Sequence, residues 1–377
     1  MDFAQFKQEV IEYSKTIGID KIGFTTASTF DEMKNRLIRQ QELQYQSGFE
    51  EPDIEKRVNP GLLVDKPRSI ISIALAYPSK MKVRVVSKKG ERRGIFCRAS
   101  WGKDYHHVLR DRLQKLEEFI HARVPEAICK SMVDTGELVD RAVAQRAGIG
   151  WSGKNCSIIT PEFGSYVYLG EMITNLPFES DEPMEDRCGS CNKCVEVCPT
   201  GALIQGGQLD AQKCIAFLTQ TKGFLAEPYR EKLGNRLYGC DTCQTVCPEN
   251  KGKDFHSHEE MEPDPEVAKP LLRPLLFISN REFKEKFGPV SGSWRGKKPI
   301  QRNAIIALAH YKDETAIGDL IKVMTTDPRP VIRGTAAWAL GKIGGEESLS
   351  ALEFALQHEK DEEVLAEIKK GLSYIEQ

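Results

Sequence analysis

Cysteine is the residue type whose spacing in this sequence points most directly to chemistry. Eight of the eleven cysteines lie between residues 188 and 247, and the other three, Cys97, Cys129 and Cys156, are scattered upstream. The first residues lack the basic stretch and apolar core of a secretion signal, so we expect a cytoplasmic protein whose thiols stay reduced. Clustered cysteines in such a protein bind metal more often than they form disulfides.

The spacing of the clustered cysteines is typical of bacterial ferredoxins. Residues 188–199 follow the pattern Cys-x2-Cys-x2-Cys-x3-Cys-Pro, and Cys214 precedes a second run, Cys-x2-Cys-x3-Cys-Pro, at residues 240–248. In paired runs of this kind the last cysteine of each run ligates the cluster of the other, so we predict two [4Fe–4S] clusters in a ferredoxin-like segment. The predicted ligands of cluster one are Cys188, Cys191, Cys194 and Cys247. The predicted ligands of cluster two are Cys198, Cys214, Cys240 and Cys243.

A structural zinc site is the simpler alternative for these cysteines. Zinc takes four ligands and has no use for the crossed cysteine–proline pattern, which therefore favours iron–sulfur clusters. Cys214 lies farther from Cys240 than a compact ferredoxin run allows, and this predicts an insertion between the two halves. Because two neighbouring clusters conduct single electrons, the rest of the chain should hold something to reduce.

The remaining sequence must supply the elements that position such a centre. A length of 377 residues predicts two or three domains, and 40% hydrophobic with 29% charged residues is typical of globular proteins. No apolar run approaches the ~18 residues that a membrane helix needs. The net charge of −2 means that any contact with nucleic acid must come from local basic patches.

Residues 1–180 alternate helical and β-rich stretches, which predicts an α/β (α+β) domain that begins with an amphipathic helix over residues 1–18. The predicted strands are Lys21–Thr26, Ser69–Tyr77, Ala127–Val133, Ser157–Thr160 and Tyr166–Thr174. The further predicted helices are Asp31–Gln46, Asp104–Arg123 and Glu137–Ala147. Charged, proline-bearing connectors at residues 179–187 and 256–270 then divide the chain into predicted domains 1–180, 181–262 and 263–377.

The last of these domains repeats itself. Residues 306–324 match residues 338–356 at an offset of 32, and a partial third copy covers residues 364–375. Small residues stand where paired helices would touch. The pattern resembles a short HEAT-type α-solenoid, which either presents a binding face or simply covers the ferredoxin-like segment.

Two motifs in the first domain could belong to a substrate site. Asp134 ends an apolar strand just before a predicted helix, where it is either an N-cap or, because Thr135 can cap equally well, a carboxylate available for catalysis. The glycine-dense segment at residues 148–155, GIGWSGKN, is neither a dinucleotide fingerprint nor a Walker loop. Its glycines predict close approach of the backbone to a large ligand.

Two basic stretches could contact phosphate groups. Residues 80–93 hold seven basic residues and one acid on a predicted β-like ribbon, and residues 281–302 hold seven bases and two acids. Each is either a phosphate-binding patch or a solvated face. The motif of a known RNA-binding module is absent from the sequence.

Several motifs together resemble the epoxyqueuosine reductase family, over essentially the whole chain and in order. The motifs are RVNPGLL at 57–63, GKDYH at 102–106, VDTG at 133–136, GIGWSGKN at 148–155 and YGCDTCQ at 238–244, with the paired cysteine runs. The segment Cys97–Trp101 departs from the family, in which a small residue followed by Arg-Tyr-Ala is common. This departure concerns the role of Cys97, which the family pattern does not fix.

The resemblance implies a cobalamin, held base-off beside the two clusters as in reductive dehalogenases, and the conversion of epoxyqueuosine to queuosine at the wobble position of tRNA. It implies that Asp134 is the proton donor, with a pKa raised by burial against the corrin. The residues that match the expected cobalamin pocket are Arg57, Cys97, Asp134, Ile158 and Leu169.

The expected partners follow from the same resemblance. They are a tRNA whose modified base is flipped into the pocket and an external low-potential electron donor, with the enzyme a monomer away from membranes. Two alternatives remain at this stage. One is another corrinoid iron–sulfur reductase acting on a small molecule, and the other is an electron-transfer or RNA-binding module whose clusters are structural.

Overall fold

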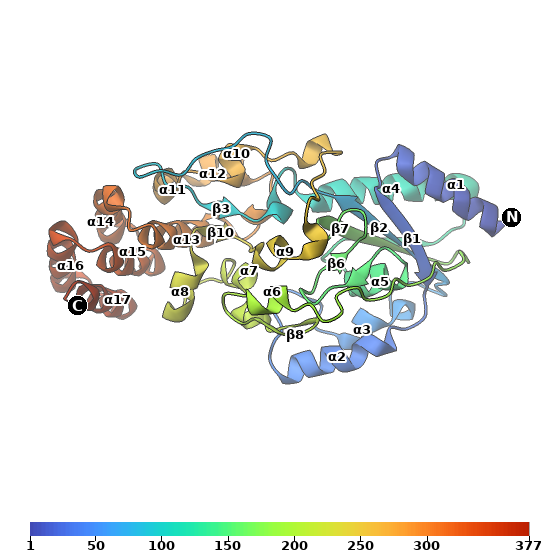
Figure 1. Ribbon diagram of the computed structural model, residues 1–377, viewed down its shortest axis with the longest axis horizontal. Helices are drawn as coiled ribbons and strands as arrows, with labels where there is room; N and C mark the ends of the chain where they lie inside the picture. The colour runs from blue at the N-terminus through green and yellow to red at the C-terminus, as the bar shows by residue number, and fades with distance from the viewer. Residues whose placement is uncertain (377) are drawn as a thin grey trace. The chain divides into compact units, whose positions relative to one another are not determined.

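The computed structural model describes residues 1–376, and its contacts divide the chain into two compact units (Figure 1). The first unit consists of residues 1–80, 103–214 and 241–262. The second consists of residues 81–102 and 215–240 and of the chain from Pro263 onward. No helix in residues 1–376 combines the length and the apolar character needed to cross a lipid bilayer.

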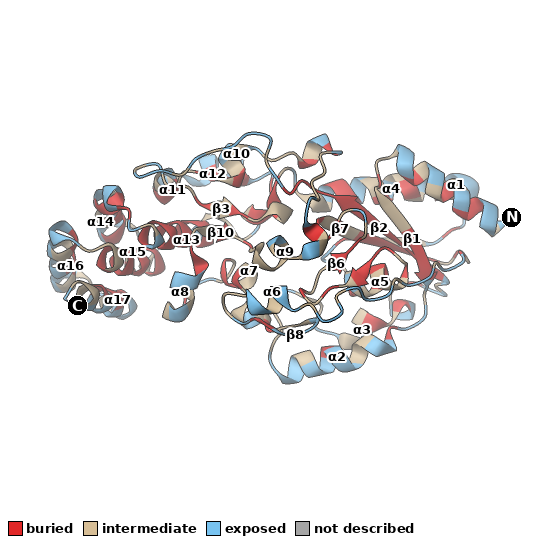
Figure 2. Ribbon diagram, in the orientation of Figure 1, coloured by how far each residue is buried: buried red, intermediate tan, exposed pale blue. Residues whose placement is uncertain are grey.

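The first unit is built on a four-stranded sheet with the order β1-β2-β7-β4, in which every neighbouring pair is antiparallel. Its strands are β1 (Lys21–Thr26), β2 (Ser69–Ala76), β4 (Cys129–Met132) and β7 (Val167–Thr174). All eight residues of β2 are buried, which Figure 2 shows as a red strand. The predicted strands are therefore confirmed, with bounds that differ by no more than two residues at either end. The fifth predicted strand is β6 (Ile158–Ile159), which pairs with β5 (Trp151–Ser152) in a separate hairpin.

Helices cover both faces of this sheet. Side chains alternate between the faces of a strand, so Gly170 and Glu171 of β7 point in opposite directions. On the Gly170 face, Leu109 and Leu113 of α4 (Tyr105–Arg123) approach within 3.5 Å of a Cβ placed at Gly170. On the other face, α5 (Asp140–Arg146) packs Val143 into an apolar cluster of the sheet. The remaining helices of this region are α1 (Phe3–Thr16), α2 (Asp31–Glu42) and α3 (Ile54–Val58).

The helix after Asp134 begins later than the sequence predicted. α5 begins at Asp140, and its N-cap position is Val139, which makes no side-chain capping bond. Neither Asp134 nor Thr135 caps α5, so the interpretation of Asp134 as an N-cap is wrong. In α4, Asp104 is the N-cap, since it accepts a hydrogen bond from the His106 backbone N–H at 3.0 Å.

The cysteine runs of the first unit lie on short elements. One-turn helices α6 (Lys193–Glu196) and α9 (Thr242–Thr245) each follow the first cysteines of a run and contact each other. The hairpin of β8 (Leu203–Gln205) and β9 (Gln208–Leu209) follows the first run. It forms part of the predicted insertion between the two halves.

The second unit is mainly a stack of helices. Its largest helices are α13 (Lys297–His310), α14 (Ile317–Thr326), α15 (Pro330–Ile343), α16 (Glu346–His358) and α17 (Glu362–Ile375). A Cβ on Gly341 of α15 would lie 2.3 Å from the Cα of Gly371 in α17, so these two backbones touch. This confirms the prediction that small residues stand where paired helices meet. Shorter elements of this unit are β3 (Ile95–Phe96), α7 (Ile215–Leu218), α8 (Glu227–Leu233), β10 (Arg236–Tyr238), α10 (Pro265–Ala268), α11 (Leu272–Phe277) and α12 (Asn280–Phe287).

Candidate functional site

Asp134 follows the end of edge strand β4 and is contacted from both faces of the sheet. The Tyr105 hydroxyl donates a hydrogen bond to Asp134 Oδ2 at 2.9 Å, and His106 Nε2 lies 3.3 Å from the same oxygen. From the opposite face, Asp140 Oδ2 accepts a hydrogen bond from the Asp134 backbone N–H at 3.2 Å. Asp134 has a φ of 54°, a left-handed conformation that costs an ordinary residue about 1 kcal/mol. Its side chain is nevertheless 58% exposed, so the loop presents a carboxylate to a ligand.

His106 lies between two carboxylates. Its Nδ1 atom is 2.7 Å from Asp104 Oδ1, on the side opposite Asp134. Partial burial lowers the pKa of His106, but hydrogen bonds and charge attraction to Asp104 and Asp134 outweigh it and raise this pKa to about 9. His106 is therefore an imidazolium at neutral pH.

The residues around Asp134 lower its pKa. The hydrogen bond with His106 is the largest influence and lowers the pKa of Asp134, with the Tyr105 hydroxyl acting in the same direction. Partial burial opposes this without reversing it. The imidazolium next to Asp134 therefore stabilises the carboxylate. The expected rise of this pKa through burial against a corrin stays a prediction. The proton of this pair is held on His106.

A second pair of carboxyl groups lies beneath Asp134. Glu171 of β7 is completely buried on the face that α5 covers, and Asp140 is its neighbour. Burial, and then the charge of Asp134, raise the pKa of Asp140 to about 6. Burial, and then the charge of Asp140, raise the pKa of Glu171 well above its usual range. At neutral pH this pair therefore retains a proton.

Three of the residues predicted for cobalamin lie in the same unit as Asp134. Ile158 and Leu169 belong to one apolar cluster, packed beside Ala144 of α5. The Arg57 guanidinium is half-buried, and burial lowers its pKa; it makes no ion pair or side-chain hydrogen bond with any residue from 1 to 376. An unpaired guanidinium and the exposed Asp134 carboxylate suit the amide groups at the edge of a corrin, whereas Ile158, at 2% exposed, lies in the core of the unit.

Cys97, the remaining predicted residue of the pocket, belongs to the second unit. There its backbone N–H donates to the Tyr238 carbonyl at 2.9 Å. A Cβ on Gly239 would lie 2.2 Å from Cys97 Sγ, so the thiol packs against the segment just before Cys240.

The glycine-dense segment serves the protein itself. A Cβ on Gly150 would lie 2.3 Å from the Ile159 carbonyl oxygen, and one on Gly153 would lie 2.5 Å from Ile159 Cδ1. These glycines let the β5–β6 hairpin close. The prediction that they leave room for a large ligand is wrong at these two positions.

The predicted ligands of cluster one are brought together. Cys188, Cys191, Cys194 and Cys247 all line a single cavity, next to Lys154, Arg187 and Lys193. Burial raises the pKa of the Cys194 thiol, and the nearby Cys247 and Cys188 raise it further. Four convergent thiols from two separate cysteine runs fit a cubane cluster.

The cysteines predicted for cluster two are half-buried. Cys198, Cys214 and Cys243 belong to the first unit, and Cys240 is the residue at which the chain leaves the second unit. Burial raises the pKa of Cys198, but backbone N–H groups, that of Leu203 foremost, outweigh it and lower this pKa below its usual value. The lowered pKa favours the thiolate form of Cys198, which is the form that binds iron.

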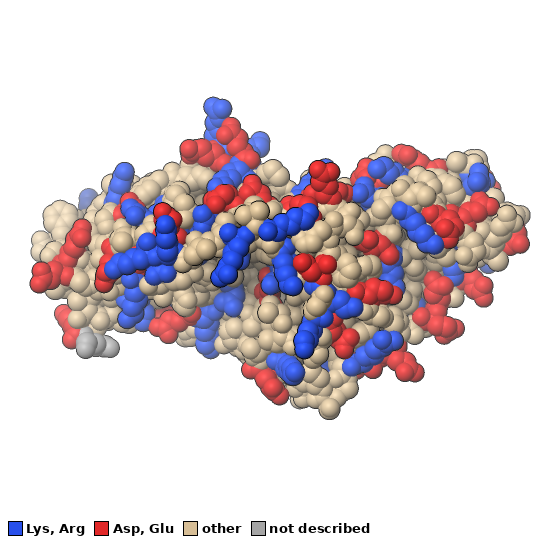
Figure 3. Space-filling view, turned by 45° about the horizontal axis from the view of Figure 1, so that its top comes forward, with Lys and Arg blue, Asp and Glu red and all other residues tan. Residues whose placement is uncertain are grey.

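The two basic stretches differ in form from what the sequence suggested. The predicted β-like ribbon is reduced to two isolated bridges, Lys88 with Glu91 and Arg93 with Leu271. Lys89 forms an ion pair with Glu314 at 2.7 Å. Arg302 is 1% exposed and donates to backbone carbonyl groups, among them that of Leu218, so it is a core residue. Figure 3 shows Lys and Arg interspersed with Asp and Glu on the face that it presents.

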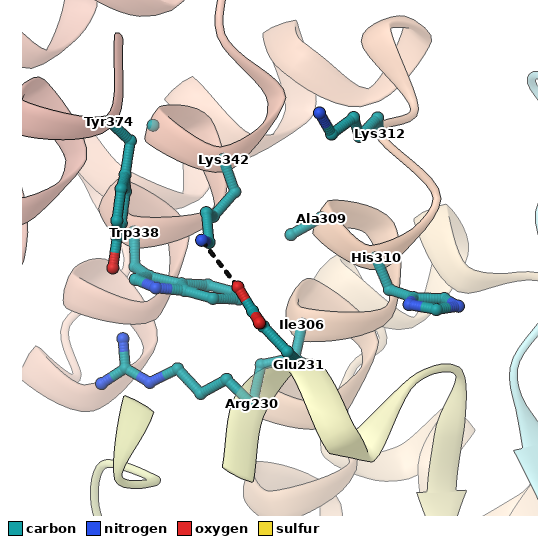
Figure 4. A pocket seen from close by; sticks show the side chains of 10 residues that line it. Arg230, Glu231, Ile306, Ala309, His310, Lys312, Trp338, Lys342 and Tyr374 are labelled. Carbon is teal, nitrogen blue, oxygen red and sulfur yellow. Dashed lines mark ion pairs between the residues drawn. The ribbon is translucent and has the colours of Figure 1, made fainter. Parts of the chain in front are cut away.

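A hollow of about 490 Å³ lies in the second unit, and none of the predicted site residues lines it (Figure 4). Trp338 and Tyr374 line it, and the Lys342 ammonium forms an ion pair with Glu231 at 2.8 Å across it. Nothing in the sequence pattern predicted this hollow.

Sequence reasoning missed His106 and the carboxyl pair of Asp140 and Glu171. A histidine in the first turn of a helix is by itself no sign of a site. The available signal was the spacing of Asp104 and His106, which places an acid and a base on the first turn of one helix. Glu171 had a signal too, because it is a charged residue in the middle of an apolar strand.

Comparison with known proteins gives a consistent result along the chain. Residues 57–135 match the family described as epoxyqueuosine reductase QueG, DUF1730. Residues 187–250 match the 4Fe-4S double cluster binding domain, and residues 296–373 match HEAT repeats. The matches agree with the predicted cluster segment and helical repeats.

Relatives cover the whole chain. An epoxyqueuosine reductase of Bacillus anthracis is 74% identical over 377 residues, which is 100% of this chain and 99% of the relative. A crystal structure of an epoxyqueuosine reductase with an epoxyqueuosine-modified tRNA-Tyr stem loop is 68% identical, with a TM-score of 0.98 over 100% of both chains. A Bacillus subtilis epoxyqueuosine reductase with its own Asp134 catalytic loop swung out of the active site is 68% identical, with a TM-score of 0.97 over 99% of this chain and 100% of that one.

Proposed function

This chain belongs to the epoxyqueuosine reductase family, and from that premise we propose that it reduces epoxyqueuosine to queuosine in tRNA with Asp134 and His106 as its proton-donating pair. It is an oxidoreductase. The observation that carries the proposal is the exposed Asp134 carboxylate, held by Tyr105 and His106 at the end of β4. The Bacillus subtilis relative, whose catalytic loop carries an aspartate of the same number, supports this assignment.

The reaction defines what the site must supply. Removal of the epoxide oxygen leaves an alkene and water, and the balance requires two electrons and two protons. The eight clustered cysteines are proposed to hold the two [4Fe–4S] clusters that pass electrons singly, with the sets assigned from the sequence. An external low-potential donor is proposed to supply these electrons.

Cobalamin is the proposed second cofactor. Arg57, Ile158 and Leu169 are proposed to hold it together with Cys97, on the strength of the family and of the half-buried, unpaired Arg57 guanidinium. When bound, a cobalamin supplies a cobalt centre that stores electrons and reacts with carbon.

The protons come from this chain's own residues. Asp134 carries the carboxyl group that reaches the leaving oxygen, and His106 holds the proton in the free protein. A bound ligand that removes water from the exposed carboxylate favours its neutral form, so the proton passes from His106 Nε2 to Asp134 Oδ2 and on to the oxygen. Tyr105 orients that carboxylate. The second proton enters through the same pair.

The substrate and setting follow from the family. The proposed partner is a tRNA with epoxyqueuosine at the wobble position, whose base is flipped into the site. We further propose that the protein acts as a monomer in the cytoplasm, and that residues 1–180, 181–262 and 263–377 are its three functional domains.

The test uses the full chain, reconstituted with iron and sulfide without oxygen and then loaded with cobalamin. Mass spectrometry of the nucleosides of an epoxyqueuosine-bearing tRNA is expected to show queuosine after addition of a chemical reductant. The absorption of base-off cob(II)alamin is expected on loading. A protein that carries both cofactors and leaves epoxyqueuosine unchanged would contradict the proposal.

A further inference from the structure

The glycine-dense segment carries one cation, Lys154, that the proposed reaction does not use. Lys154 is half-buried, and its ammonium group donates hydrogen bonds to the Gly189 carbonyl at 2.7 Å and to Asn192 Oδ1 at 3.0 Å. Both acceptors lie between the first and the third cysteine of the first run. A lysine of the β5–β6 hairpin is thus tied to the loop that carries three predicted ligands of cluster one.

The stem of Lys154 is fixed as well as its end. A Cβ on Gly206 would lie 3.0 Å from Lys154 Cγ and 3.4 Å from both Cδ and Cε, so the stem runs along the β8–β9 turn. The Gly207 N–H donates to the Lys154 carbonyl at 3.4 Å. Because contacts at the stem and at the ammonium group restrict its rotamers, the positive charge has a defined place.

That place is beside the four thiols. Lys154 lines the same cavity as Cys188, Cys191, Cys194 and Cys247. Two further cations line it, Arg187 and Lys193. Lys193 is exposed and Lys154 is half-buried, so water screens the charge of Lys193 more strongly than that of Lys154.

We propose that Lys154 is a positioning residue for cluster one, which fixes the Cys188–Cys194 loop and raises the reduction potential of the cluster with its charge. The proposal rests on the cluster ligands assigned under the proposed function. A cubane held by four thiolates is an anion, and it gains one more negative charge when it accepts an electron from a low-potential donor. No proton takes part in that step. A fixed neighbouring cation stabilises the reduced form more than the oxidised form.

The consequence concerns how electrons enter the protein. A cluster of higher potential is easier for the external donor to reduce, so Lys154 sets the driving force of the first transfer. It does so from the hairpin whose strand β6 carries Ile158, a residue proposed for the cofactor pocket. One short segment then contributes to both proposed cofactor sites.

The experiment is a redox titration followed by electron paramagnetic resonance, on full-length protein reconstituted with iron and sulfide but without cobalamin or tRNA. Lys154→Met removes the charge and keeps most of the stem, and Lys154→Arg keeps the charge. Lys193→Met is the matched control, since it removes an exposed cation of the same cavity. Iron content is measured on each sample.

In Lys154→Met we expect one of the two clusters to become at least tenfold harder to reduce, which is a midpoint potential about 59 mV more negative for one electron. The other cluster, and both clusters of Lys154→Arg and Lys193→Met, should shift by less than threefold. Lys154→Met with full iron and unchanged potentials would overturn the proposal. If Lys154→Met loses iron, its potentials cannot be compared, and the iron content of Lys154→Arg becomes the test. Loss of iron from Lys154→Arg as well would rule out a role for the charge.

The test of Lys154 can succeed or fail independently of the proposed function. The potentials are measured without substrate, so an enzyme inactive on tRNA can still show the shift. In Cys188→Ala the cluster that responds to Lys154 should be the one that is missing. A Cys188→Ala protein that keeps the responsive cluster would refute the ligand assignment instead.

Discussion

Replacing Asp134 with Asn is the most informative single change at this site. Asn keeps the size of the side chain and tolerates the left-handed backbone at φ 54° at least as well, so the loop should keep its conformation. It cannot give a proton to a leaving oxygen. We expect Asp134→Asn to load both clusters and cobalamin and to bind tRNA, yet to turn over roughly 10²–10⁴-fold more slowly.

The structure also predicts what the change does to His106. The pKa of His106 rises from its ordinary 6.5 to about 9 through two carboxylates, and Asp134→Asn removes one of them. At about 1.4 kcal/mol per pKa unit, the whole shift corresponds to about 3 kcal/mol before screening. Because water screens the exposed Asp134 carboxylate, its interaction with His106 should contribute about 1 kcal/mol to the free energy of unfolding.

The direction of each pKa shift determines the pH range in which the interaction of Asp134 with His106 stabilises the fold. His106 has a raised pKa, so its stabilisation is complete below its ordinary value of 6.5 and is lost as the pH rises through about 9. Asp134 has a lowered pKa, so its stabilisation is present above its ordinary value of 3.8 and is lost as the pH falls through its lower value in the folded state. The free energy of unfolding should therefore differ most between the two proteins from about pH 4 to pH 6.5, and the difference should vanish above pH 9.

Three measurements on one preparation test this reasoning. They are iron and cobalamin content, the conversion of epoxyqueuosine to queuosine, and urea unfolding at pH 6 and at pH 10. Glu137→Gln is the matched control, because Glu137 lies on the same loop and pairs with Lys130 at 2.8 Å without any contact to His106. Full activity in a correctly loaded Asp134→Asn protein would remove Asp134 from the mechanism. An unchanged stability difference at pH 10 would refute the coupling to His106.

Further changes test other parts of the proposal. His106→Gln should slow turnover roughly 10-fold to 10²-fold and abolish the loss of activity that we expect for the unmodified protein above about pH 9, as seen in a pH–rate profile. Cys191→Ala should lower the iron content from about eight atoms per chain to about four, whereas Cys129→Ala should leave it unchanged in an iron assay. Gly341→Ala should destabilise the second unit by about 1–3 kcal/mol in thermal unfolding, because its Cβ would meet Gly371, and should leave the iron content intact.

Local patterns predicted the elements well where burial follows from the sequence alone. Strand β1 has the predicted bounds, Lys21–Thr26, and β2 is buried throughout because both faces of the sheet are covered. The repeat at an offset of 32 residues predicted the paired helices, since small residues such as Gly341 must recur where backbones touch. The cysteine spacing predicted which four thiols share a cavity, because the crossed pattern itself encodes the pairing.

Features that depend on tertiary contacts were not predictable in this way. The helix after β4 begins at Asp140, because the preceding loop is held by the hydrogen bond from the Asp134 N–H to Asp140 rather than by a local cap. The glycines at 150 and 153 accommodate Ile159, and a sequence does not show whether a ligand or the protein's own backbone will fill the space beside a glycine. Arg302 looks like part of a basic surface in the sequence, yet buried carbonyl groups surround it.

The protonation of the site shows how a residue that caps a helix can also take part in the function. Asp104 caps α4 by accepting the His106 N–H at 3.0 Å, and its same oxygen lies 2.7 Å from His106 Nδ1. A helix cap can be predicted from the sequence. Here the capping carboxylate of Asp104 also fixes which ring nitrogen of His106 faces Asp134 and keeps that nitrogen protonated. The acid of this site is consequently a property of three residues on two elements. Asp134 supplies the position, His106 the proton, and Asp104 the charge that keeps the proton there until water is displaced from Asp134.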